Sequence, residues 1–190
     1  MRRLKQLRTY EVALEKAGLG PVAGIDEAGR GACFGPVTIA ACVLPPEPIA
    51  ALDGLTDSKK LSAKKREVLF DDIRTAAIAH HVIHIPAAVI DRRGIQHANL
   101  DGARKAVAGL GVDPGYVLVD AFRVPGLRAP QLPVVGGDYT ARCIAAASVL
   151  AKVSRDRLVT EMASEYPVYG LEGHKGYSTK VHMDAVRRHG

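Results

Sequence analysis

Residues 24–36 read Gly-Ile-Asp-Glu-Ala-Gly-Arg-Gly-Ala-Cys-Phe-Gly-Pro. The apolar segments on either side, residues 21–25 and 37–44, have the length and composition of buried strands. We expect the first strand to end at two adjacent carboxylates, Asp26 and Glu27, and the glycine turn Gly29-Arg30-Gly31 to follow. The simplest alternative is a β-hairpin with a solvated acid pair and a flexible turn.

The chemistry of this stretch alone fits a metal and phosphate site as well as it fits that alternative. Carboxylates at the end of a buried strand are costly to desolvate unless a positive charge pairs with them. Hard oxygen ligands suit Mg²⁺ or Mn²⁺. Glycines let backbone amides approach a ligand closely, and the planar guanidinium of Arg30 suits a phosphate group.

The bulk composition predicts one soluble domain with a polyanionic partner. The chain has 190 residues, of which 47% are hydrophobic, so it can bury a sizeable core. A net charge of +6 favours a partner such as nucleic acid. We find neither a signal peptide nor a run of the about 18 apolar residues that would span a membrane. We expect a cytoplasmic monomer whose three cysteines stay reduced, with residues 1–190 as one domain and residues about 166–190 as a substrate-contacting loop and helix.

The order of apolar segments along the chain is typical of an α/β fold. Expected strands cover residues 21–25, 37–44, 80–85, 116–120 and 134–135. Expected helices cover residues 1–17, 63–79, 87–91, 95–110, 143–163 and 178–188, with Ser62 and Ser178 as N-caps.

Acids recur where expected strands end. Asp120 closes the continuous apolar strand 116–120, and Asp138 follows the short strand 134–135 through two glycines. Strand ends at one edge of an open α/β sheet lie close together, and active sites form there. Four carboxylates that meet at one place repel each other strongly without a cation. This repeated pattern therefore predicts a metal site built from Asp26, Glu27, Asp120 and Asp138.

Other polar groups leave alternatives open. Lys59-Lys60 suits a phosphate backbone, but an ordinary exposed basic turn explains it as well. His80, His81 and His84 do not share one face of a strand, which argues against a zinc site. Ser148 and Lys152 fit a buried or substrate-facing network better than a hydrolytic pair. Asp156 is a candidate for a further carboxylate of the site, but an ion pair with Lys152 or Arg155 explains it as well.

Five blocks of sequence together resemble bacterial ribonuclease HII. They are Gly24-Ile25-Asp26-Glu27-Ala28-Gly29-Arg30-Gly31, Asp57-Ser58-Lys59-Lys60-Leu61, Val117-Leu118-Val119-Asp120, residues 145–156 and His174-Lys175-Gly176-Tyr177. The resemblance implies a ribonuclease H-like fold, a central mixed sheet flanked by helices with a C-terminal helical segment. It also implies an endonuclease that cuts RNA in RNA/DNA hybrids and cuts 5′ to ribonucleotides embedded in duplex DNA.

The resemblance also implies roles for individual residues. Asp26, Glu27, Asp120 and Asp138 match the family's metal-binding acids, which would hold two Mn²⁺ or Mg²⁺ ions in the substrate complex. Gly29-Arg30-Gly31 matches the turn that senses the ribose 2′-hydroxyl, and Tyr177 matches a tyrosine that stacks on the neighbouring sugar. Arg30, Lys59 and Lys175 would hold phosphates.

The sequence departs from the family near Asp138 and after the glycine turn. Gly136 and Thr140 stand where lysines are common, so we expect less positive charge there, and Ala32-Cys33-Phe34 replaces the usual Pro-Leu-Ala. Two rival functions remain: a resolvase-like nuclease of the same fold that acts on DNA alone, and a non-catalytic binder of RNA/DNA hybrids.

Overall fold

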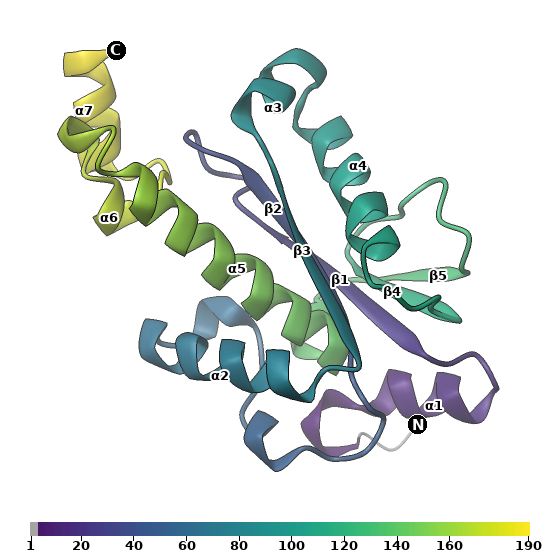
Figure 1. The fold of residues 1–190 in the computed structure, drawn as a ribbon. Coiled ribbons are helices and arrows are strands. Elements are labelled where there is room, and N and C mark those ends of the chain that lie inside the picture. The colour runs from purple at the N-terminus through teal and green to yellow at the C-terminus, as the bar shows by residue number, and fades with distance from the viewer. Residues whose placement is uncertain (1–3) are drawn as a thin grey trace.

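A mixed sheet in the order β3-β2-β1-β4-β5 forms the centre of the computed structural model, which describes residues 4–190 (Figure 1). The strands are β1 (Val22–Ala28), β2 (Val37–Val43), β3 (Ala79–Ile85), β4 (Tyr116–Asp120) and β5 (Gln131–Val134). Strand β2 runs antiparallel to β1 and β3, whereas β4 is parallel to β1 and to β5. The expected α/β architecture with a mixed sheet is therefore confirmed.

Helices cover both faces of the sheet (Figure 1). They are α1 (Thr9–Lys16), α2 (Ala63–Ala76), α3 (Ala87–Arg93), α4 (Ile95–Ala108), α5 (Arg142–Met162), α6 (Leu171–His174) and α7 (Lys180–His189). One apolar cluster joins one face of the sheet to α2 and α5, and another joins the opposite face to α4. In the described part of the chain, no helix is both long and apolar enough to cross a membrane.

Helix α5 packs unusually close to β1 because both elements have small residues at the contact. Ala145, Ala146 and Ala147 are fully buried. A Cβ on Gly24 would lie 2.2 Å from the carbonyl carbon of Cys143, so the strand backbone touches the helix backbone. This close packing brings the polar side of α5 to the end of β1.

The first turn of α5 is anchored by buried charged groups. Glu11 is 2% exposed and accepts a hydrogen bond of 2.7 Å from the Cys143 amide. Burial raises the pKa of Glu11. The fully buried Arg142 donates to the carbonyl oxygens of Pro45 and Glu47. These contacts tie α1 and the segment after β2 to the start of α5.

Several element boundaries differ from those expected. Asp26 and Glu27 lie inside β1 rather than beyond its end, because their backbones still pair with β2. Strand β5 begins earlier than expected, at Gln131, and ends at Val134. Thr179 caps α7 instead of Ser178. The Ser62 cap is confirmed by a hydrogen bond from the Lys65 amide.

Helix lengths also differ modestly from expectation. Within the described chain, the helix expected over residues 1–17 is a 3-10 turn (Lys5–Leu7) followed by α1, and residues 1–3 lie outside that part. Helix α2 ends at Ala76, and α4 ends at Ala108. All three cysteines are free, as expected.

Candidate active site

Asp26 and Asp120 lie on neighbouring parallel strands. The β1–β4 register aligns Ile25 with Val119, and the two aspartates come next along each strand. Asp26 is only 5% exposed. Burial raises the pKa of Asp26 well above its usual value, and the charges of Glu27 and Asp120 raise it further. The sheet thus brings acids from two distant blocks of sequence together.

Asp138 joins them through a tight turn rather than at a strand end. It lies in the 3-10 turn Gly137–Tyr139, which follows β5, and is 5% exposed. The Gly137 amide donates a 2.8 Å hydrogen bond to Oδ1 of Asp120, which holds the turn against β4. Burial, and then the charges of Asp57 and Asp120, raise the pKa of Asp138 to about 6.

Glu27 approaches the same group of acids from the α4 side of the sheet. Its neighbour Asp26 faces α5, because successive side chains of a strand point to opposite faces. Burial raises the pKa of Glu27, the charge of Asp120 raises it further, and Arg30 opposes the change. A guanidinium nitrogen of Arg30 lies 3.9 Å from a Glu27 carboxylate oxygen.

The donor chemistry of these acids fits a hard divalent cation. Buried carboxylates whose pKa values are raised by mutual repulsion are stabilised when a cation binds among them. Within residues 4–190, no three His, Cys, Asp or Glu side chains are close enough to form a ready-made metal-binding group. Proteins usually bind Mg²⁺ through one or two carboxylates together with waters and substrate phosphates. His84 instead contacts the Thr38 hydroxyl at 2.8 Å.

Arg155 connects the glycine turn to the C-terminal loop. This fully buried side chain donates hydrogen bonds to the carbonyl oxygens of Phe34, Pro36 and Lys175 at 2.9, 3.0 and 2.9 Å. Gly29 has φ +94°, and a Cβ there would lie 2.0 Å from Nε of Arg155. Only glycine therefore allows the turn to pack on this arginine.

Tyr177 lies beside the glycine turn, although it is far away in sequence. Ala32 and Tyr177 form an isolated antiparallel bridge, and the Cys33 amide donates to the Gly176 carbonyl at 3.1 Å. The Lys152 ammonium lies 4.9 Å from the centre of the Tyr177 ring. A cavity of about 310 Å³ is formed by Glu27, Ala28, Gly29, Arg30, Gly31, Ser58, Lys59, Ser148, Lys152 and Tyr177.

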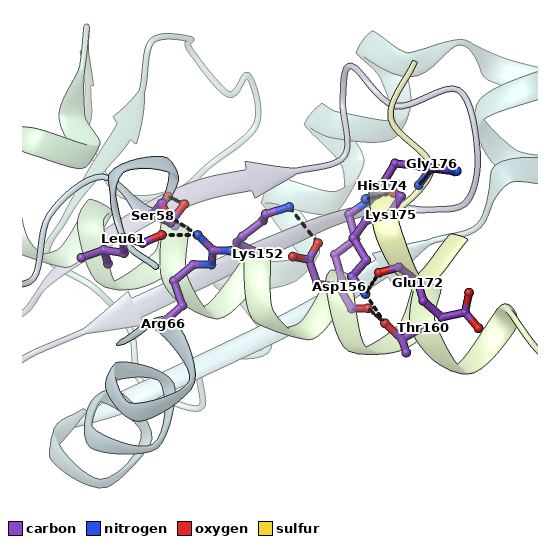
Figure 2. Close-up of polar contacts among 12 residues, drawn as sticks. Ser58, Leu61, Arg66, Lys152, Asp156, Thr160, Glu172, His174, Lys175 and Gly176 are labelled. Atoms are coloured by element: carbon purple, nitrogen blue, oxygen red, sulfur yellow. Dashed lines mark hydrogen bonds and ion pairs between the residues drawn. The ribbon is translucent and has the colours of Figure 1, made fainter. Parts of the chain in front are cut away.

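Lys59 lines this cavity, and side-chain hydrogen bonds from two neighbouring residues fix the conformation of its loop. The Asp57 side chain accepts from the Lys59 amide at 2.9 Å, and Arg66 donates to the carbonyl oxygens of Ser58 and Leu61 (Figure 2). Partial burial opposes the charge on Lys59, but the surrounding acids, above all Asp26 and Asp138, raise its pKa overall.

Lys175 does not line this cavity. Its ammonium donates to the Thr160 hydroxyl at 2.6 Å and to the Glu172 carbonyl at 2.7 Å, in a second groove between α2 and α5 (Figure 2). Lys152 lies closer to the acids and pairs with Asp156 at 2.8 Å. The Ser148 hydroxyl shares a 2.8 Å hydrogen bond with the Ser58 hydroxyl, whereas the ammonium of Lys152 pairs with Asp156.

The loop before Asp138 has Gly136 where a lysine is common in the family, so the positive charge near Asp138 has another source. A Cβ on Gly136 would lie 2.1 Å from the Tyr139 hydroxyl, so the Tyr139 ring covers this part of the loop. The ammonium of Lys60 lies 5.0 Å from the centre of that ring. Positive charge near Asp138 comes from Lys59, which lies on a different loop.

Sequence reasoning missed two polar residues of α4. Gln96 accepts a 2.9 Å hydrogen bond from Arg30, and Asn99 is fully buried near Glu27. A signal existed for Asn99, since it shares the buried side of the helix with Ala103 and Ala106 at helical spacing.

Comparison with known proteins gives a consistent result. The family described as Ribonuclease HII matches residues 23–190. The ribonuclease HII of Corynebacterium efficiens is 68% identical over all of this chain and 82% of the relative, and that of Corynebacterium diphtheriae is 64% identical over all of this chain and 83% of the relative. The crystal structure of ribonuclease H2 from Pyrococcus horikoshii has a TM-score of 0.73 at 28% identity, over 85% of this chain and 82% of that one.

Proposed function

This chain belongs to the ribonuclease HII family of metal-dependent endoribonucleases, and we propose that it cuts RNA in RNA/DNA hybrids and 5′ to ribonucleotides embedded in duplex DNA. The products would be a 3′-hydroxyl and a 5′-phosphate. The observation that carries this proposal is that Asp120 lies close enough to both Asp26 and Asp138, which come from two other segments, for its charge to raise their pKa values.

Asp26, Glu27, Asp120 and Asp138 would hold two Mg²⁺ or Mn²⁺ ions. When bound, these cations supply the acidity that activates a water and stabilises the departing 3′ oxygen. The protein contributes the placement of the four carboxylates. Ser148 supports Asp26, since its hydroxyl lies close enough to that carboxylate to favour the charged form.

The glycine turn and Tyr177 would select ribose. The 2′-hydroxyl is the group that distinguishes RNA from DNA. A Cβ on Gly31 would meet no atom within 4 Å, so the backbone there borders open space in which a sugar fits. The Tyr177 ring faces the same cavity and would stack on the neighbouring sugar.

Arg30, Lys59 and Lys152 would contact phosphates around the cut, and Lys175 would act farther away, from its own groove. Binding should weaken as salt rises, because each phosphate contact releases counterions. We infer that residues 1–190 act as one catalytic domain and as a monomer, with residues about 166–190 reaching the substrate.

A duplex with one embedded ribonucleotide, incubated with Mg²⁺ or Mn²⁺, tests the proposal. Cleavage 5′ to the ribonucleotide supports it. Binding without cleavage would identify a non-catalytic hybrid binder instead. Equal cleavage of an all-DNA duplex would identify a resolvase-like nuclease.

A further inference from the structure

Asn99 is a fully buried residue whose amide has no ordinary hydrogen bond. Its exposed fraction is 0%, and both Oδ1 and Nδ2 lack a partner. In the described part of the chain, it is the one residue with two such atoms in its side chain. Buried polar groups without a partner reduce stability, so a persistent one calls for a functional explanation.

The position of Asn99 on α4 points toward the acids. Gln96, three residues earlier on the same side of the helix, accepts a 2.9 Å hydrogen bond from Arg30. Arg30 in turn lies 3.9 Å from Glu27. One side of α4 therefore faces both the glycine turn and Glu27.

Asn99 is buried in α4, which packs on the face of the sheet that Glu27 shares with Ala23 and Ile25, and its amide lies close to the Glu27 carboxylate. The two groups nevertheless do not form a hydrogen bond of ordinary geometry, because both polar atoms of Asn99 remain unpartnered. The amide is thus adjacent to Glu27 but not yet engaged with it.

We propose that Asn99 is a positioning residue for Glu27, whose carboxylate it holds by a hydrogen bond from Nδ2 when a divalent cation binds. This inference rests on the proposed function. A carboxylate that ligates a cation needs a fixed orientation, and a hydrogen bond to it supplies one. Asparagine is neutral, so it orients Glu27 without repelling the cation, whereas Arg30 adds positive charge beside the same carboxylate.

Replacement by leucine separates this role from a structural one. Leucine has a similar size, and removal of an unpaired buried amide should leave the melting temperature unchanged or higher. We expect Asn99→Leu to weaken Mn²⁺ binding by about 10-fold, the lower end of the loss seen when a partner of a metal ligand is removed. Calorimetric titration of the metal-free protein with Mn²⁺ measures this without any cleavage assay.

Gln96→Leu is the matched control on the same side of α4. It removes the contact to Arg30 and should weaken duplex binding, while Mn²⁺ affinity changes less than about twofold. Equal losses of Mn²⁺ affinity in the Gln96 and Asn99 variants would overturn the proposal, because the effect would then belong to the whole helix face. Wild-type Mn²⁺ affinity in Asn99→Leu would also overturn it.

Two further measurements keep the test decisive. Cleavage by Asn99→Leu should recover as Mn²⁺ is raised, with an unchanged dissociation constant for the duplex. If the leucine variant does not fold, the Mn²⁺ affinity of Asn99→Ala tests the same point, because alanine also lacks the Nδ2 donor. Failure of the wild-type protein to bind Mn²⁺ or to cleave would contradict the proposed function itself, whereas unchanged variants of an active enzyme contradict this inference alone.

Discussion

Asp26 and Asp120 occupy adjacent positions on the two central parallel strands, one residue beyond the aligned pair Ile25 and Val119. The backbone register itself therefore keeps two carboxylates together in a place where burial disfavours the charge of Asp26. The two carboxylates repel each other when both are charged, and a bound cation would offset this repulsion.

Asp26→Asn should abolish turnover and leave binding of an RNA/DNA hybrid largely intact. We expect the cleavage rate to fall by more than about 100-fold. Removal of a hydrogen-bond partner of a metal ligand costs up to about 100-fold, and removal of the ligand itself should cost more. The melting temperature of the metal-free protein should rise, because the neutral amide no longer repels Asp120. Single-turnover cleavage and thermal unfolding measure the two effects, and near-normal rates would refute the metal assignment.

Stability of the metal-free protein should fall as pH rises toward neutrality. The pKa of Asp138 increases from 3.8 to about 6 on folding, and those of Asp26 and Glu27 also increase. A group that binds its proton more tightly when folded stabilises the protein below its unfolded pKa, and this contribution disappears as pH passes the folded value. Melting temperatures should be measured across roughly pH 4–8, once in a chelator and once in Mg²⁺. The two curves of melting temperature against pH should diverge above about pH 6. Parallel curves would contradict this.

Tyr177→Ala should reduce cleavage at an RNA–DNA junction more than it reduces duplex affinity. The ring borders the cavity beside the glycine turn, where it would meet a sugar rather than anchor the duplex. Tyr177→Phe is the control, because it keeps the ring and should retain most of the junction cleavage. If alanine lowered rate and affinity equally, the ring would be a packing residue.

Lys59→Ala should weaken duplex binding more than Lys175→Ala does. Lys59 lines the cavity beside the acids, whereas the Lys175 ammonium is held by Thr160 and Glu172. Loss of one phosphate contact should reduce the slope of log affinity against log salt by about 1. Titration of a labelled duplex at several salt concentrations decides the order, and equal effects would refute it.

Gly24→Ala should destabilise the protein, and Gly31→Ala should not. A Cβ on Gly24 would meet the backbone of α5 at 2.2 Å, and such overpacking typically costs about 1–3 kcal/mol. A Cβ on Gly31 meets nothing within 4 Å, so that variant should keep its melting temperature and lose cleavage at ribonucleotides. Denaturant unfolding checks the first outcome, and cleavage assays check the second.

Local patterns in the sequence were enough to predict an α/β fold and the candidate acids, and the resemblance to ribonuclease HII added the mixed sheet. The apolar run before Asp120 is continuous because β4 is covered on both faces, and the blocks around Asp26 and Asp120 lie at neighbouring strands of one sheet. Boundaries were less accurate, because backbone pairing with β2 extends β1 through both acids.

Burial patterning and motif order, both properties of the linear chain, thus determined the fold class and the acids. Only the tertiary structure decided the partners of the long polar side chains: Lys175 bonds to Thr160, Lys60 lies over Tyr139, Arg155 holds the glycine turn, and Asn99 lies beside Glu27. The physical reason is that a flexible side chain reaches groups from several elements. Which of them it meets depends on how helices pack on the sheet, and no local pattern records that packing.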